Sequence, residues 1–233
     1  MARFALTFDD GPGPSTAELL DVLRDAGATA TFFILGRNVV EAPWCAGDHA
    51  RARSLVVRAL REGHIIGNHS HSHGRPEKYQ TLADEIRRTD RLIRELEHEA
   101  GVTPRPIPVR LPYGIRLVDT TERGPHGSRA ASVLDPRLAV LASIGRTHVH
   151  WTSDFEDWTL GPGDGARLAA QMLAHIEHAA AEGLDAVLDL HDAGTGSSWG
   201  YARPATVSAV AELLAQGQAR GWTTFSVPDL GSP

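Results

Sequence analysis

The sequence predicts an α/β fold in which parallel strands alternate with helices. Short runs rich in Val, Ile, Phe and Thr alternate about seven times with longer amphipathic stretches along the 233 residues. Strand, helix and strand repeated in this way require parallel strands joined by helical crossovers. No linker or internal repeat interrupts the pattern, so we expect a single domain over residues 1–233.

The predicted strands are short apolar segments bounded by turn residues. In chain order they are Phe4–Phe8, Thr29–Ile34, His64–Asn68, Ile107–Leu111, Thr147–Thr152, Ala186–Leu190 and Thr223–Val227.

The predicted helices have apolar residues at a spacing of three and four. Leu82 to Leu96 shows this spacing, and Ala166–Ala181 and Ala205–Arg220 are predicted helices as well. Ser15 is a candidate N-cap for the first helix, with Glu18 completing a capping box. Glycines follow four helical runs, as expected for helix C-termini: Gly27, Gly63, Gly183 and Gly221.

Two stretches, Val39–Asp48 and Ile115–Pro136, are predicted insertions. Long loops of this kind either shape a binding mouth or are simply mobile, and the sequence leaves both open.

Composition excludes several kinds of partner. The net charge is −6 without a Lys/Arg cluster, which argues against nucleic acid and anionic membranes. The single cysteine, Cys45, cannot form an internal disulfide and has no adjacent base. No leader-like or bilayer-spanning run is present. If Met1 is the natural start, we expect a cytoplasmic protein, although a secreted chain that had lost its leader would look the same. The oligomeric state stays open.

Polar residues gather directly after the predicted strands. They are Asp9 and Asp10, His69 to His73, Arg110, Asp154 with Asp157 and Trp158, and His191 with Asp192. In a barrel of parallel strands these positions share the C-terminal face, where active sites are built.

The first group is a pair of adjacent carboxylates, Asp9 and Asp10. Two such groups repel each other unless one is protonated, and a divalent cation relieves the repulsion. One carboxylate can then be a ligand and the other a base. Taken alone, Asp-Asp-Gly-Pro favours a simple turn over a catalytic pair.

The second group contains His69 and His73, four residues apart. This spacing directs both imidazoles at one point and suits Zn, Fe, Co or Ni. A strand with one polar face is the alternative, and His71 points away from its neighbours in either geometry. One Asp and two His leave open positions, as at a catalytic metal.

The remaining groups complete a candidate acid–base site. His191 is either a core histidine or a general acid, and Asp157 is placed to orient it. Arg110 is either a surface group or the partner that keeps Asp9 ionised. Trp158 and Trp199 either wall a sugar-binding cleft or pack in the core.

These segments resemble the five ordered motifs of the polysaccharide deacetylase family of carbohydrate esterases, also called the NodB-homology family. The resemblance runs from residue 4 to about residue 228. Its motifs are Thr7-Phe8-Asp9-Asp10-Gly11-Pro12, His69-Ser70-His71-Ser72-His73, Arg110-Leu111-Pro112-Tyr113-Gly114, Asp154-Phe155-Glu156-Asp157-Trp158 and Leu188-Asp189-Leu190-His191-Asp192.

The resemblance implies a distorted (β/α)7 barrel of TIM-barrel type with its active site at the C-terminal ends of the strands. It also implies roles for individual residues. Asp9 would be the base, His191 the acid, Arg110 and Asp157 their respective partners, and Asp10, His69 and His73 the ligands of one divalent metal. Zn is the first choice of metal, with Co, Ni or Fe as alternatives. The backbone N–H of Tyr113 would donate a hydrogen bond to the oxyanion. The other residues implied to bind the substrate are Pro112, Asp154, Trp158 and Leu190.

The sequence therefore predicts a metal-dependent N-deacetylase of an N-acetylated amino sugar, with a small-molecule or oligosaccharide substrate. Two alternatives stay open: a deacylase of a small intracellular metabolite, and a carbohydrate-binding pseudoenzyme. Gly74 stands where the family often has proline, as does Leu111, and the loop from Ile115 is longer than usual. These departures put the identity of the substrate in doubt.

Overall fold

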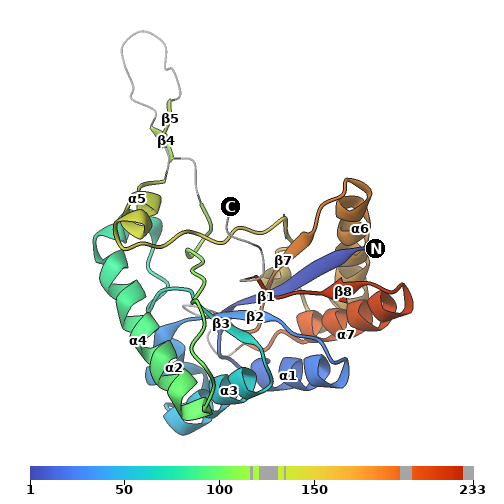
Figure 1. Cartoon of the computed structure of the whole chain (residues 1–233), viewed down its shortest axis with the longest axis horizontal. Coiled ribbons are helices and arrows are strands. Elements are labelled where there is room, and N and C mark those ends of the chain that lie inside the picture. Colours follow the sequence, from blue (N-terminus) through green and yellow to red (C-terminus); the bar gives the residue numbers. More distant parts are fainter. Residues whose placement is uncertain (116–117, 121–130, 134, 195–200, 228–233) are drawn as a thin grey trace.

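The structure is a computed structural model that describes residues 1–115, 118–120, 131–133, 135–194 and 201–227 (Figure 1). Its centre is a parallel sheet surrounded by helices, which confirms the predicted α/β fold with helical crossovers. No helix within these ranges is both long and apolar enough to cross a bilayer.

The sheet is built around β1, which is buried from its second residue to its last. The strands neighbour one another in the order β3-β2-β1-β7-β6, and all pairs are parallel. β8 pairs with the first two residues of β1. The strand bounds are β1 Arg3–Gly11, β2 Thr31–Ile34, β3 Ile65–Asn68, β6 Ser153–Asp154, β7 Ala186–His191 and β8 Thr223–Thr224.

Two predicted strands, Ile107–Leu111 and Thr147–Thr152, are wrong as regular strands. Each contributes an isolated parallel bridge: Val109 pairs with Asn68 on one side and with His148 on the other. Prolines at 104, 106, 108 and 112 supply no N–H, so this stretch cannot form a full ladder. The second segment reaches β7 through Thr152 N–H, which donates to Val187 O, and then continues as β6. The bridges continue the parallel arrangement past β3, as expected for a distorted barrel, without a regular ladder.

Helices cover the outside of the sheet (Figure 1). The α-helices are α1 Thr16–Asp25, α2 Gly36–Val40, α3 His49–Arg61, α4 Leu82–Ala100, α5 Pro136–Ser143, α6 Gly165–Ala181 and α7 Pro204–Ala219. The 3₁₀ turns are η1 Pro43–Cys45, η2 Pro76–Thr81, η3 Asp157–Thr159 and η4 Pro162–Asp164. One continuous apolar core joins the sheet to these helices and includes Phe8, Leu20, Ile93, Met172 and Leu213.

The helix ends agree with the sequence in part. The four predicted C-terminal glycines all have positive φ, between 62° and 89°. Ser15 is the N-cap of α1, but the predicted capping box with Glu18 is wrong, because the Ser15 side chain caps no N–H of its own helix. Its hydroxyl instead accepts the backbone N–H of Arg203 at 2.6 Å, which ties α1 to the start of α7.

The two predicted insertions differ in structure. The first contains the end of α2 and η1, and it finishes at Asp48, which caps α3 by accepting the N–H of Arg51. The second contains an antiparallel pair, β4 Val118–Thr120 and β5 Ala131–Val133, which projects from the body of the molecule (Figure 1). Residues 116–117, 121–130 and 134 of this insertion lie outside the described residues.

Candidate active site

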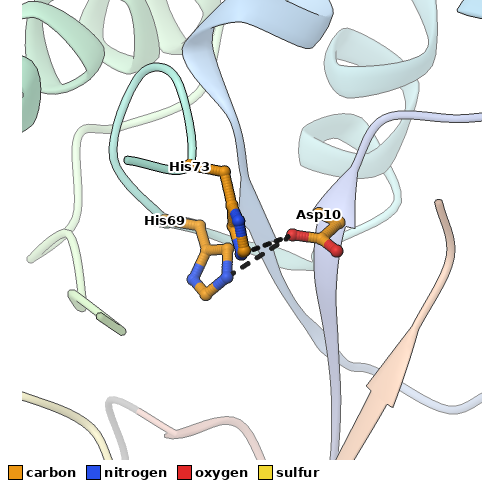
Figure 2. A group of neighbouring side chains, drawn as sticks. All are labelled: Asp10, His69 and His73. Carbon is orange, nitrogen blue, oxygen red and sulfur yellow. Dashed lines mark ion pairs between the residues drawn. The ribbon is translucent and has the colours of Figure 1, made fainter. Parts of the chain in front are cut away.

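Asp10, His69 and His73 converge where β1 and β3 end (Figure 2). Asp10 Oδ1 lies 3.5 Å from His69 Nε2 and 3.4 Å from His73 Nε2. One ligand atom from each residue lies within 4.8 Å of the other two. The structure therefore brings together the three residues predicted as metal ligands.

A bulge in β1 explains how neighbouring aspartates face one site. Successive side chains of a regular strand point to opposite faces. The register between β1 and β2 shifts between Asp9 and Gly11, and Asp10 has a left-handed φ of 71°. A bulge of this kind redirects a side chain. Both carboxylates consequently line the same cavity.

The chemistry of the three side chains fits a divalent cation. Asp10 Oδ1 is buried without a hydrogen-bond partner among the described residues. Burial lowers the pKa of His69 and of His73 to about 3, so both rings are neutral and each can offer a nitrogen lone pair to a metal. His69 Nδ1 lies 2.9 Å from Arg110 O, which favours the tautomer with its lone pair on Nε2. A buried, unpartnered carboxylate oxygen facing two neutral imidazoles is a typical set of metal ligands.

Arg110 forms a buried ion pair with Asp9. The guanidinium is fully buried, and its Nη1 lies 2.9 Å from Asp9 Oδ1. Burial raises the pKa of Asp9, and the charge of Arg110 opposes that rise. Asp9 is therefore a carboxylate with increased affinity for a proton, held in a fixed direction.

Asp189 shares the same guanidinium and was not assigned a role from the sequence. Its Oδ1 lies 2.8 Å from Arg110 Nη1, and burial raises its pKa to about 8. Period-two alternation could have found it, because Asp189 precedes His191 by two positions in β7 and both line the cavity.

His191 in β7, the register partner of Asp9, forms a pair with the buried Asp157. His191 Nδ1 lies 2.8 Å from Asp157 Oδ1, while Asp157 Oδ2 accepts the backbone N–H of His191 at 3.0 Å and the hydroxyl of Thr206 at 2.6 Å. Burial alone would lower the pKa of His191, but the Asp157 carboxylate raises it to about 10. Despite burial, the contacts with His191 lower the pKa of Asp157. The imidazole is thus held protonated.

Replacing Asp157 with asparagine is expected to move the basic limb of the pH–rate profile to lower pH. A general acid works only while protonated, so the rate falls as pH rises through the pKa of His191. Removing the Asp157 charge lowers that pKa by about 1–3 units. A cation bound nearby would lower the pKa of His191 in both enzymes, so the difference in this pKa between them would remain. The measurement is kcat against pH for the wild-type and Asp157→Asn enzymes. A basic limb at the same pH in both would contradict the role of Asp157 in raising the pKa of His191.

The cavity around these residues has a volume of about 580 Å³. Three aromatic residues in its lining are exposed: Tyr113 at 45%, Trp158 at 41% and Tyr201 at 63% of their surface. The ring of Trp158 packs edge-on against His191, with centroids 4.9 Å apart. The cavity therefore combines a charged floor with exposed aromatic rings.

The remaining candidate residues differ in where they lie. Asp154 lines the cavity with Tyr113 and Trp158. Leu190 does not, because it packs in the apolar core. Pro112 is buried and does not line the cavity either, although Tyr113, the next residue, does. His71 is 5% exposed and Cys45 is partly buried, and neither lines the cavity. Trp199 lies outside the described residues.

Asp192 packs against the end of β1, next to Gly11. Its carboxylate accepts the hydroxyl of Thr16, and burial raises its pKa to about 7. A Cβ at Gly11 would lie 2.6 Å from both Asp192 carboxylate oxygens, so a larger residue at position 11 would require the Asp192 side chain to move.

Comparison with known proteins agrees with this architecture. Residues 2–125 match the family model described as polysaccharide deacetylase. A chitooligosaccharide deacetylase from Bradyrhizobium sp. (strain ANU 289) is 31% identical over 97% of this chain and 89% of that protein. A peptidoglycan-N-acetylglucosamine deacetylase from Bacillus cereus is 33% identical over 67% of this chain and 46% of that protein. The crystal structure of a polysaccharide deacetylase from Bacillus cereus has a TM-score of 0.67 at 26% identity, covering 100% of this chain and 96% of that one.

The fold and the site define a hydrolase of the α/β class with its polar residues at the C-terminal ends of parallel strands. The chain belongs to the polysaccharide deacetylase family, whose enzymes hydrolyse amide bonds. The family and the fold predicted from the sequence are both confirmed.

Proposed function

We propose that this protein is a metal-dependent N-deacetylase that converts an N-acetylated amino sugar and water into a free amine and acetate. The observation that carries the proposal is the set of three groups in one cavity: the Asp10, His69 and His73 cluster, Asp9 on Arg110, and His191 on Asp157. The named activities of the relatives from Bradyrhizobium and Bacillus cereus support an acetylated amino-sugar substrate.

The proposed metal would be held by Asp10, His69 and His73, with Zn as the first choice and Co, Ni or Fe as alternatives. When bound, a divalent cation supplies Lewis-acid polarisation of the acyl oxygen and acidifies water.

The chain itself supplies proton transfer and orientation. Asp9, fixed by Arg110, accepts a proton from the attacking water. The backbone N–H of Tyr113 donates to the oxygen that becomes negatively charged as the amide carbonyl is attacked. His191, protonated through its contact with Asp157, gives a proton to the departing amine. One proton enters the protein at Asp9 and one leaves at His191, so the total is unchanged, and exchange with solvent then deprotonates Asp9 and reprotonates His191.

The shape of the cavity supports a sugar substrate. A sugar ring has a flat apolar face and a polar rim, which suits exposed aromatic rings above a charged floor. Tyr113, Trp158 and Tyr201 provide such rings.

The test is release of acetate from three substrates: N-acetylglucosamine, a chito-oligomer and a peptidoglycan fragment, each with the protein as purified, after chelation, and after return of one metal. We expect activity on at least one acetylated sugar that is lost on chelation and restored by the metal. Activity confined to a non-sugar N-acyl metabolite would refute the proposed substrate class. Sugar binding without acetate release under any metal would identify a pseudoenzyme instead.

A further inference from the structure

Arg137 lies buried beneath the loop that carries Tyr113. The residue is 2% exposed and does not line the catalytic cavity. Its Nη1 donates to Pro112 O at 2.6 Å and its Nη2 donates to Gly114 O at 2.5 Å. One guanidinium thus holds the carbonyls on both sides of Tyr113.

The sequence around Arg137 fixes the guanidinium in place. Asp135 is the N-cap of α5 and accepts the backbone N–H of Arg137 at 3.0 Å. The same carboxylate, 3% exposed, accepts from Arg137 Nε and Nη2 at 3.0 and 2.6 Å. Pro136 occupies the first helical position, where its fixed φ suits the helix. The buried charge is therefore neutralised, and the fork geometry limits its movement.

Holding the Pro112 carbonyl also determines the direction of the Tyr113 N–H. The two groups belong to one planar peptide unit, and in the trans form they point in opposite directions. With Pro112 O directed at buried Arg137, the Tyr113 N–H points away from Arg137. Tyr113 lines the catalytic cavity and Arg137 does not. A charged donor on the carbonyl also polarises the peptide and strengthens its N–H as a donor.

The backbone here needs such support. Tyr113 has φ of 63°, and Gly114 follows with φ of 64°. A left-handed conformation is unfavourable for a tyrosine and persists only where the surroundings enforce it. The contacts from Arg137 to the flanking carbonyls provide that enforcement.

We propose that Arg137 is a positioning residue that orients and polarises the Tyr113 N–H toward the developing oxyanion. This inference rests on the proposed deacetylase function. It adds a residue outside the five motifs that acts on the reaction without touching the substrate.

The test compares Arg137→Ala and Arg137→Lys with the wild-type holoenzyme. Because the donor acts mainly when the oxyanion forms, we expect kcat to fall about 10- to 100-fold in Arg137→Ala while KM changes less than about twofold. Arg137→Lys retains the charge but not the fork, so it should recover part of the loss. Added guanidinium at low millimolar concentration should partly rescue Arg137→Ala.

Arg146→Ala is the matched control. Arg146 also donates to a backbone carbonyl, that of Ile107 at 2.6 Å, and pairs with a carboxylate, that of Asp90. It does not line the cavity, and its removal should leave kcat within about twofold of wild type.

A second measurement separates positioning from general destabilisation. A phosphonate analogue of the tetrahedral intermediate should bind Arg137→Ala more weakly by the same factor as the loss in kcat, while acetate binds unchanged. Equal weakening of both ligands, or an unchanged kcat in a folded, metal-loaded variant, would overturn the inference. Absence of acetate release by the wild-type protein would instead refute the proposed function.

Discussion

Replacing His69 with alanine is expected to remove the bound metal and to lower kcat/KM about a thousandfold. The substitution deletes one of three ligands and leaves Asp10 Oδ1 facing a single imidazole. A cation at such a site supplies several kcal/mol of stabilisation to the transition state, and each 1.4 kcal/mol is worth a factor of ten. The variant should fold, because the side chain removed lies at the floor of the cavity rather than in the apolar core.

The measurement is metal content per chain together with acetate release. His98→Ala is the matched control, since His98 is an exposed histidine near the end of α4 and should keep both metal and activity. If His69→Ala retains one tightly bound metal and wild-type kcat/KM, then the cluster of Asp10, His69 and His73 is not the catalytic metal site.

The location of the site could be predicted from the sequence because strand ends are visible in it. The runs that end at Phe8, Asn68 and Leu190 are apolar and are followed at once by Asp or His. Parallel strands place these ends together regardless of the details of packing. The structure adds what strand ends alone cannot give, namely that a bulge at Asp10 turns neighbouring carboxylates toward one cavity.

Long-range contacts explain what the sequence did not predict. The prolines around Val109 are visible in the sequence and could have warned against a regular strand there. Arg137 gives no such signal, because its partners Pro112 and Gly114 lie across a predicted insertion. The hydroxyl of Ser15 likewise bonds to Arg203 rather than to its own helix, a contact over 188 positions that no local pattern specifies.

Replacing Asp9 with asparagine is expected to lower kcat by about 10²- to 10⁴-fold while the metal stays bound. The amide has nearly the shape of the carboxylate, and Arg110 keeps its contacts with Thr7 and Asp189. The side chain can no longer accept a proton from water, however. Asp10, His69 and His73 are untouched, so metal content should match wild type, which distinguishes this variant from His69→Ala.

The acid limb of the pH–rate profile provides the second readout for Asp9. Burial raises the pKa of this carboxyl, so wild-type activity should fall as pH drops through that raised pKa and the base becomes protonated. In Asp9→Asn the residual activity should lose that limb. Asp185→Asn is the control, because Asp185 pairs with Arg3 at the opposite end of the sheet and should leave the profile unchanged. A folded, metal-loaded Asp9→Asn enzyme that keeps more than about a tenth of wild-type kcat would show that another group takes the proton. Asp189, which shares Arg110 with Asp9 and has a pKa raised to about 8, would then be the base to test.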